Sequence, residues 1–242
     1  MTVQPALPPG ALWVAETFGP TVQGEGPSSG QHAMFIRLAG CHLSCSWCDT
    51  AYTWDANRYD LTAERRPATV DELLVWVKNA WTDLVVITGG EPLLQQQALI
   101  PLVTALAGDG YRIEVETSGT IAPLPALSEA VTAFNVSPKL SSSGLPEHRR
   151  IRPDALRALY GTGKAVWKFV ATDLADLDEI RALEAAIDST DGWVEPVWVM
   201  PEGVTAEVVL RRMRLLAQPV IDRGWNLSTR LHILLWGDAR GR

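Results

Sequence analysis

Short apolar runs alternate with helix-like segments along most of the chain, and this alternation limits the folds it can adopt. Six runs have the length and composition of buried strands, at residues 33–38, 84–88, 112–116, 133–137, 166–171 and 194–200. Helix patterns occur at residues 70–80, 93–107, 153–160, 174–187 and 206–217, and residues 231–236 could add a last short strand. Strands that alternate with helices form βαβ units around a parallel sheet. We therefore predict an α/β fold, a partial (open) α/β barrel of about six mainly parallel strands, fewer than in a closed barrel.

Length and charge place the chain among ordinary globular proteins. Its 242 residues fit a single domain, 1–242, with residues 1–12 as a loose lead-in because proline and glycine crowd the start. The net charge of −7 argues against a nucleic-acid-binding surface, which is normally basic. No apolar run is long enough to cross a membrane, and the N-terminus lacks the cationic start of a signal peptide. We expect a cytoplasmic protein that binds neither nucleic acid nor membranes.

All three cysteines lie in one loop that follows the first predicted strand. Cys41, Cys45 and Cys48 have the spacing C-x3-C-x2-C, and an odd number packed so closely cannot form a disulfide framework. Three thiolates can hold three corners of a cubic iron–sulfur cluster and leave the fourth iron open to a ligand. One alternative is a zinc site that adds His42, although its place beside Cys41 gives poor tetrahedral geometry. The other is three thiols without a metal.

A second distinctive segment, TGGEP at residues 88–92, follows the next predicted strand. Its two glycines would let the backbone approach a ligand closely, and Glu91 could accept a hydrogen bond from an ammonium group. Alone, the same residues could form an ordinary turn between a strand and a helix. Further distinctive segments follow strands at residues 116–119, 137–139 and 200–203. We expect all of them at the carboxyl edge of the sheet, where α/β proteins bind ligands.

The cysteine loop resembles the signature of the radical S-adenosylmethionine (SAM) superfamily, C-x3-C-x-aromatic-C, with Trp47 as the aromatic residue. The resemblance implies a [4Fe-4S] cluster on the three cysteines, SAM on its open iron, and cleavage of SAM to a 5′-deoxyadenosyl radical. Segment 88–92 is similar to the motif that contacts the SAM amino group. The SAM-binding residues that the resemblance implies are Trp47, Cys48, Asp49, Gly90, Glu91, Ser137, Pro138 and Lys139. It also implies an electron donor such as flavodoxin or ferredoxin.

Within this superfamily the chain resembles the 7-carboxy-7-deazaguanine synthase family. The similar segments are QGEG at 23–26, FIRL at 35–38, CDT at 48–50, TGGEP at 88–92, ETSG at 116–119, SPK at 137–139 and MPEG at 200–203. The similarity is strong over about the first 120 residues and weak over about the last forty. It implies conversion of 6-carboxy-5,6,7,8-tetrahydropterin to 7-carboxy-7-deazaguanine with loss of ammonia, in 7-deazapurine biosynthesis of the queuosine type. It also implies a homodimer.

The same resemblance implies how the pterin substrate is held. Arg37 would bind its carboxylate through a planar bidentate fork, and Thr50 would hold a Mg²⁺ ion that meets this carboxylate. The other substrate-binding candidates are Val22, Gln23, Gly24 and Thr88, followed by Glu25, Glu116 and His232. Relatives often carry Gln-Thr-His-Lys near the C-terminus, and His232 in segment 231–237 could take part of that role.

Each of these residues also has an ordinary structural interpretation. Arg37 could form a surface ion pair, residues 23–26 a glycine turn, Thr50 a hydroxyl cap, and Lys139 a solvated side chain. Two other functions would share part of the pattern. A glycyl-radical activating enzyme has a similar cysteine loop but acts on a protein, and segment 23–26, Arg37 and Thr50 argue against it. A non-enzymatic metal-binding module would not need segment 88–92 or a distinctive segment after each strand.

Overall fold

The computed structural model describes residues 7–187 and 196–242, and one nine-stranded sheet runs through this part of the chain. The strands are β1 (Ala11–Val22), β2 (His32–Leu38), β3 (Arg66–Thr69), β4 (Leu84–Gly89), β5 (Arg112–Thr117), β6 (Ala133–Val136), β7 (Ala165–Ala171), β8 (Val197–Pro201) and β9 (Asn226–Leu227). Their order is β3-β1-β2-β4-β5-β6-β7-β8-β9. All neighbours from β2 to β9 pair in parallel, whereas β1 is antiparallel to β2 and β3. The predicted open, mainly parallel α/β sheet is confirmed.

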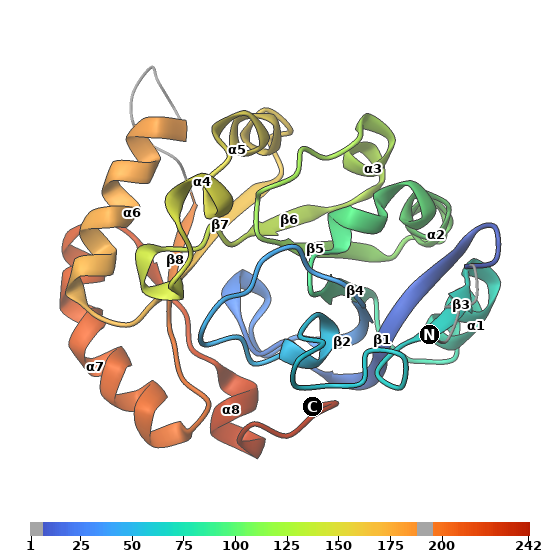
Figure 1. Cartoon of the computed structure of the whole chain (residues 1–242), viewed down its shortest axis with the longest axis horizontal. Coiled ribbons are helices and arrows are strands. Elements are labelled where there is room, and N and C mark those ends of the chain that lie inside the picture. Colours follow the sequence, from blue (N-terminus) through green and yellow to red (C-terminus); the bar gives the residue numbers. More distant parts are fainter. Residues whose placement is uncertain (1–6, 188–195) are drawn as a thin grey trace.

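Helices accompany the sheet, most of them on its outer side. They are α1 (Val70–Lys78), α2 (Gln96–Gly108), α3 (Pro125–Ala130), α4 (Glu147–Arg150), α5 (Pro153–Tyr160), α6 (Leu174–Ile187), α7 (Ala206–Asp222) and α8 (Leu231–Trp236). Figure 1 shows the strands in an arc, with α2, α3, α5, α6 and α7 around its outer side and α8 on its open side. Within the described ranges, no helix is long and apolar enough to cross a membrane.

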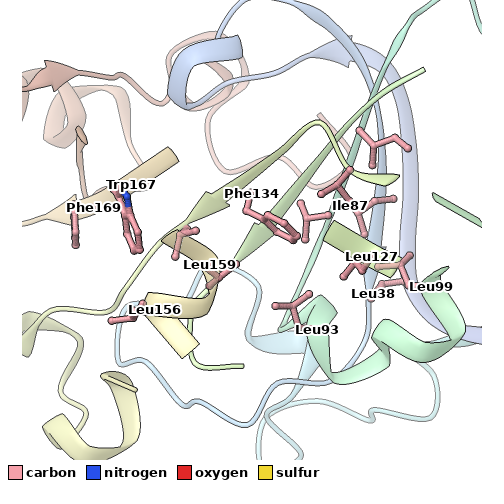
Figure 2. Close-up of a cluster of buried hydrophobic side chains, with 14 of the residues drawn as sticks. Leu38, Ile87, Leu93, Leu99, Leu127, Phe134, Leu156, Leu159, Trp167 and Phe169 are labelled. Atoms are coloured by element: carbon pink, nitrogen blue, oxygen red, sulfur yellow. The ribbon is translucent and has the colours of Figure 1, made fainter. Parts of the chain in front are cut away.

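The main hydrophobic core lies between the sheet and these helices. Val85 and Ile87 of β4 belong to this core, whereas Leu84 and Val86 belong to a smaller cluster that also contains Phe18. Successive side chains of a strand point to opposite faces, so β4 is buried on both. Burial on both faces explains why the sequence shows a continuous apolar run here instead of an alternating one. Figure 2 shows part of the main core around Ile87.

Two predictions near the ends of the chain are wrong. Strand β1 begins at Ala11, and Leu12 is fully buried, so these residues do not belong to a loose lead-in. Residues 1–6 of that lead-in, and residues 194–195 of the last predicted core strand, lie outside the described residues. The segment Leu231–Trp236 forms helix α8 instead of a strand, and Ile233 is its buried residue. Its apolar run therefore faces the protein on one side, as in a surface helix.

Candidate active site

A cavity opens at the carboxyl edge of the parallel strands, where the distinctive segments were expected. The residues predicted from the sequence that line it are Val22, Gln23, Gly24, Glu25, Arg37, Cys41, Cys45, Trp47, Cys48, Asp49, Thr50, Thr88, Gly90, Glu116, Ser137, Lys139 and His232. Of the predicted residues, Glu91 and Pro138 do not line it. Motifs that are far apart along the chain therefore meet around one cavity.

The cysteine loop is held from one side by the 3-10 helix η4 (Ser141–Ser143). The Ser46 backbone N–H donates to the Ser143 carbonyl oxygen at 2.9 Å. The Trp47 indole N–H donates to the Ser142 carbonyl oxygen at 3.0 Å. These bonds fix the middle of the loop, so the thiols on either side have defined positions on the cavity wall.

The three thiols suit a strongly positive partner. All three are free cysteines and line the cavity. Burial raises the pKa of the Cys41 thiol to about 12 and also raises the pKa of Cys45, so thiolates here need a bound cation. In the described part of the chain, no three His, Cys, Asp or Glu side chains are placed to hold a single metal ion. His42 Nε2 lies 2.7 Å from Thr120 Oγ1, so this ring nitrogen already has a partner outside the cysteine loop.

The two glycines of segment 88–92 allow close packing against β2. A Cβ atom on Gly89 would lie 2.3 Å from the Leu38 carbonyl oxygen, and one on Gly90 would lie 2.3 Å from the Gly40 carbonyl oxygen. No side chain fits at such distances. The sequence suggested that these glycines approach a ligand, but what they approach in the structure is the backbone that leads into the cysteine loop.

Glu91 has a structural role that the sequence did not suggest. Its side chain is fully buried. The carboxylate accepts hydrogen bonds from Thr117 Oγ1 at 2.7 Å, the Ser118 backbone N–H at 2.9 Å and the Leu93 backbone N–H at 3.1 Å. These bonds tie the end of β4 to the end of β5. The Glu91 carboxylate is therefore occupied within the protein, and a contact between Glu91 and the SAM amino group stays a prediction.

Lys139 lies against Trp47 and does not extend into solvent. Its Nζ donates to Ser137 Oγ at 3.0 Å and lies 5.7 Å from the centre of the Trp47 ring. Such contacts hold an ammonium group in place beside an aromatic face. We call the surface formed by Cys41, Cys45, Cys48, Trp47, Gly90, Ser137 and Lys139 the cysteine wall.

Arg37 projects from β2 with part of its guanidinium still available. Its Nε lies 3.4 Å from Glu16 Oε2, and its guanidinium carbon lies 5.4 Å from the centre of the Phe18 ring. Burial disfavours the charge, but Tyr52 and nearby carboxylates, Glu16 among them, raise the pKa of Arg37 above its ordinary value. Among the described residues, its two terminal nitrogens have no hydrogen-bond or ion-pair partner. The ion pair with Glu16 therefore uses Nε and leaves the two terminal nitrogens of the Arg37 guanidinium available.

Thr50 begins the 3-10 helix η2 (Ala51–Thr53) without capping it. Its side chain makes no capping hydrogen bond, and its hydroxyl oxygen lies 3.6 Å from Cys48 Sγ. The alternative role as a hydroxyl cap is thus not what the structure contains. Thr50 lines the cavity beside the cysteine wall.

Opposite charges meet on a second surface, which we call the charged wall and which consists of Glu25, Glu116, Lys168, Arg230 and His232. Lys168 Nζ lies 2.6 Å from Glu25 Oε2 and 3.1 Å from Glu116 Oε1, and Arg230 Nε lies 3.2 Å from Glu25 Oε1. Lys168 and Arg230 are only 4% and 7% exposed. Burial raises the pKa of Glu25, but Lys168 and Arg230 outweigh it and hold that pKa far below its ordinary value. Glu25 is therefore an ionised acceptor at neutral pH.

Gln23 and His232 complete the polar lining next to this wall. Gln23 Nε2 donates to Glu116 Oε1 at 3.3 Å, and its Oε1 accepts from the Glu25 backbone N–H at 3.3 Å. Residues 23–26 are therefore more than a glycine turn, because their side chains join the cavity wall. Burial lowers the pKa of His232, which keeps this imidazole neutral near pH 7.

Lys168 and Arg230 were missed by sequence reasoning. A signal for Lys168 existed, since a lysine inside the apolar run AVWKFVA of β7 must find a partner when it is buried. Arg230 gave no such signal, because it precedes a segment that was interpreted as a strand. The sequence therefore predicted the two carboxylates of the charged wall but not the two cations that pair with them.

Comparison with known proteins defines the class first. Residues 35–159 match the family model of the radical SAM superfamily. The crystal structure of Streptococcus suis SuiB bound to SAM has a similar fold, with a TM-score of 0.52 and 14% identity over 80% of this chain and 49% of that chain. The chain is thus a radical SAM enzyme, a class that implies a [4Fe-4S] cluster, SAM, a small-molecule substrate and an electron donor.

Full-length relatives narrow the class to one family. Two proteins called 7-carboxy-7-deazaguanine synthase, from Pyrobaculum aerophilum and Halobacterium salinarum, are each 35% identical, covering 95% and 97% of this chain and 96% and 92% of their own. The crystal structure of QueE from Escherichia coli matches with a TM-score of 0.69 and 28% identity over 92% of this chain and 95% of that chain. The chain belongs to the 7-carboxy-7-deazaguanine synthase family.

Proposed function

We propose that this chain converts 6-carboxy-5,6,7,8-tetrahydropterin to 7-carboxy-7-deazaguanine by hydrogen abstraction, ring contraction and loss of ammonia. The observation that carries the proposal is the content of one cavity, which combines three thiols, the free end of a guanidinium and the carboxylates of the charged wall. These groups suit, in turn, an iron–sulfur cluster, a substrate carboxylate and the N–H donors of a pterin ring.

The cysteine wall is the proposed site of the cluster and SAM. Cys41, Cys45 and Cys48 would hold the cluster, and Lys139 would pair with the SAM carboxylate from the position that Ser137 and Trp47 give it. When bound, the cluster and SAM would supply a 5′-deoxyadenosyl radical that abstracts a hydrogen atom from the substrate. The protein's own contribution is to hold these groups in a fixed orientation and to exclude water.

Arg37 and Thr50 are the proposed binding groups for the substrate carboxylate. The two terminal nitrogens of Arg37 can form a bidentate pair with a carboxylate, while Glu16 fixes the guanidinium from behind through Nε. The Thr50 hydroxyl would be one ligand of a Mg²⁺ ion that meets the same carboxylate, with water as most of its other ligands. Thr88, which lines the cavity, would contact the same substrate.

The charged wall is the proposed partner of the pterin ring. Glu25 and Glu116 can accept hydrogen bonds from the exocyclic amino group and ring N–H groups, and Gln23 can both donate and accept. Backbone groups of Val22, Gln23 and Gly24 complete this edge of the cavity. Small charged and amide groups of this kind suit a polar ring better than a peptide segment, which disfavours a glycyl-radical activating enzyme.

The proposal includes partners beyond the substrate. We infer an electron donor of the flavodoxin or ferredoxin kind, a homodimer, a cytoplasmic location and no nucleic-acid ligand, with a product that enters 7-deazapurine biosynthesis. Support comes from the family membership and, for the absence of a nucleic-acid surface, from the net charge of −7.

An anaerobic assay tests the proposed activity. The cluster-loaded protein is incubated with SAM, Mg²⁺, a chemical reductant and the carboxytetrahydropterin, and products are identified by mass spectrometry. We expect 7-carboxy-7-deazaguanine, ammonia and 5′-deoxyadenosine, with no deazaguanine from a Cys45→Ala control. Formation of 5′-deoxyadenosine without any deazaguanine would assign the chain a different substrate.

A further inference from the structure

One guanidinium connects three segments around the cavity. Arg230 Nε lies 3.2 Å from Glu25 Oε1, its Nη1 donates to the Gly203 carbonyl oxygen at 2.7 Å, and its Nη2 pairs with the Asp49 carboxylate. Glu25 follows β1, Asp49 belongs to the cysteine loop and Gly203 follows β8. Arg230 itself precedes α8 and is 7% exposed. The three partners belong to different loops, so this single side chain fixes their relative positions.

Only arginine can make this set of contacts. Its guanidinium carries five N–H donors in a rigid plane, whereas lysine offers one compact ammonium group that cannot reach three separated acceptors. The two carboxylates also need a cation, because a buried charge without a partner is strongly unfavourable. Glu25 has a second cation in Lys168, whereas Arg230 is the cation paired with Asp49 among the described residues.

Hydrogen bonds hold residues 228–231, which we call the Arg230 segment, against residues 23–26. The Leu231 N–H donates to the Gly24 carbonyl oxygen at 2.8 Å, and the Gly26 N–H donates to Ser228 Oγ at 2.8 Å. A Cβ atom on Gly24 would lie 2.0 Å from His232 Nδ1, so glycine is required there. The Arg230 segment and residues 23–26 therefore form one rigid unit, and the Arg230 side chain extends that unit to the cysteine loop.

We propose that Arg230 is a positioning residue that holds the SAM side of the cavity, through Asp49, at a fixed distance from the substrate side, through Glu25. This inference rests on the proposed function, in which Asp49 faces SAM and Glu25 faces the pterin ring. A hydrogen transfer between two bound ligands depends on their spacing, and a displacement of about 1 Å can cost on the order of 100-fold in rate. Loss of Arg230 should therefore impair the transfer more than the binding of either ligand.

The first test measures how well SAM cleavage is coupled to product formation. Conversion of the carboxytetrahydropterin to the deazaguanine and ammonia is redox-neutral, so the abstracted hydrogen can be returned within one turnover, and in wild-type holoenzyme we expect no less than one deazaguanine for each 5′-deoxyadenosine released. Arg230→Gln and Arg230→Lys should each lower the deazaguanine formed per 5′-deoxyadenosine by about tenfold or more, with a smaller change in the substrate KM. Arg223→Gln is the matched control, because Arg223 pairs with Asp178 away from the cavity. It should keep the wild-type ratio.

The second test measures hydrogen exchange in the anaerobic holoenzyme without SAM or substrate, and it does not depend on activity. Arg230→Lys should speed exchange both near residues 23–26 and near residues 48–50, while Arg223→Gln leaves both unchanged. Faster exchange at only one of the two segments would mean that Arg230 stabilises that segment alone, and it would overturn the proposal. A wild-type ratio of deazaguanine to 5′-deoxyadenosine in both Arg230 variants would also overturn it. If Arg230→Gln does not fold, Arg230→Lys decides the outcome alone. A wild-type enzyme that makes no deazaguanine refutes the proposed function, while the exchange measurement still tests Arg230.

Discussion

The cysteine wall and the charged wall are built in different ways. Most of the cysteine wall comes from one short loop whose three thiols follow a recognisable spacing, so this wall can be predicted from a local sequence pattern. The charged wall is assembled from the loop after β1, from β5 and β7, and from Arg230 and His232 at the start of α8, so no single stretch of sequence carries it. A site carried by one loop can be predicted from the spacing of its residues, whereas a site formed by ion pairs between distant segments cannot.

The two walls should also fail differently when they are changed. Loss of a group from the cysteine wall should abolish cofactor chemistry and leave the fold, because the thiols are partly exposed and make few internal bonds. Loss of a cation from the charged wall should cost stability first, because it removes a charge partner from half-buried carboxylates.

The largest effect is expected for the thiols. Cys41→Ala, Cys45→Ala or Cys48→Ala should each abolish cluster assembly and SAM cleavage, because each removes one of three thiolate ligands. Iron and sulfide analysis of anaerobically purified protein, with a turnover assay, measures this. Thermal melting of the cluster-free proteins serves as the control and should change little. A variant with near-normal iron content and turnover would contradict the assignment.

Lys168→Met should destabilise the protein by about 1.5–3 kcal/mol, because the half-buried Glu116 loses the cation that pairs with it, while Glu25 keeps Arg230. Urea unfolding measures the change, and Lys78→Met, at an exposed pair with Asp109, is the control that should have little effect. The low pKa of Glu25 stabilises the fold above its ordinary pKa of 4.5, and this contribution is lost as pH falls further. The cost of Lys168→Met should therefore shrink below about pH 4.5. A cost that does not depend on pH would contradict the charge-pairing explanation.

Arg37→Lys should weaken substrate binding with little change in SAM affinity. A point charge replaces the planar fork, and a lost charged hydrogen bond costs about 1.5–3 kcal/mol, or roughly 10–150-fold in affinity. Separate titrations with substrate and with SAM measure the two affinities. A fall in SAM affinity with unchanged substrate affinity would give Arg37 a different role.

A smaller effect is expected at Thr50, which tests the proposed Mg²⁺ site. Thr50→Val should lose most of the stimulation of turnover by Mg²⁺, about tenfold or less, because water can replace one ligand of this ion. Thr50→Ser keeps the hydroxyl and should keep most of the stimulation, and cluster content should be normal in both variants. Equal stimulation in wild type, Thr50→Ser and Thr50→Val would remove Thr50 from the metal site.

The fold was predictable where the physical signal was local. Strands β2 and β4 are apolar runs because both of their faces are packed in hydrophobic clusters, and the sequence shows this directly. Strand β5 instead alternates, with Ile113 and Val115 in the main core. Strand β1 was not predicted as one strand because polar residues such as Glu16 interrupt it and Gly19 and Pro20 break its pattern. Helix α8 was misassigned because six mainly apolar residues do not distinguish a strand from a short helix.

The site was predictable to the extent that single residues carry the chemistry. Thr50 and Arg37 lie on the cavity wall as expected, and Arg37 is bound to Glu16 only through Nε among the described residues. The bonds from the Glu91 carboxylate to Thr117 and Ser118 were not predicted, because no local pattern encodes a contact between these two segments. Lys168 and Arg230 were missed because their roles depend on carboxylates far away in the sequence, which only the folded chain brings to them.

The central claim is that one cavity binds the substrate at the charged wall and the cluster and SAM at the cysteine wall, so that the radical can reach the substrate. Its most direct test uses carboxytetrahydropterin that carries deuterium on its saturated ring carbons. The account predicts deuterium in the 5′-deoxyadenosine released by the wild-type holoenzyme, together with 7-carboxy-7-deazaguanine. Unlabelled 5′-deoxyadenosine formed alongside the deazaguanine would mean that the abstracted hydrogen comes from elsewhere, and the account would be wrong.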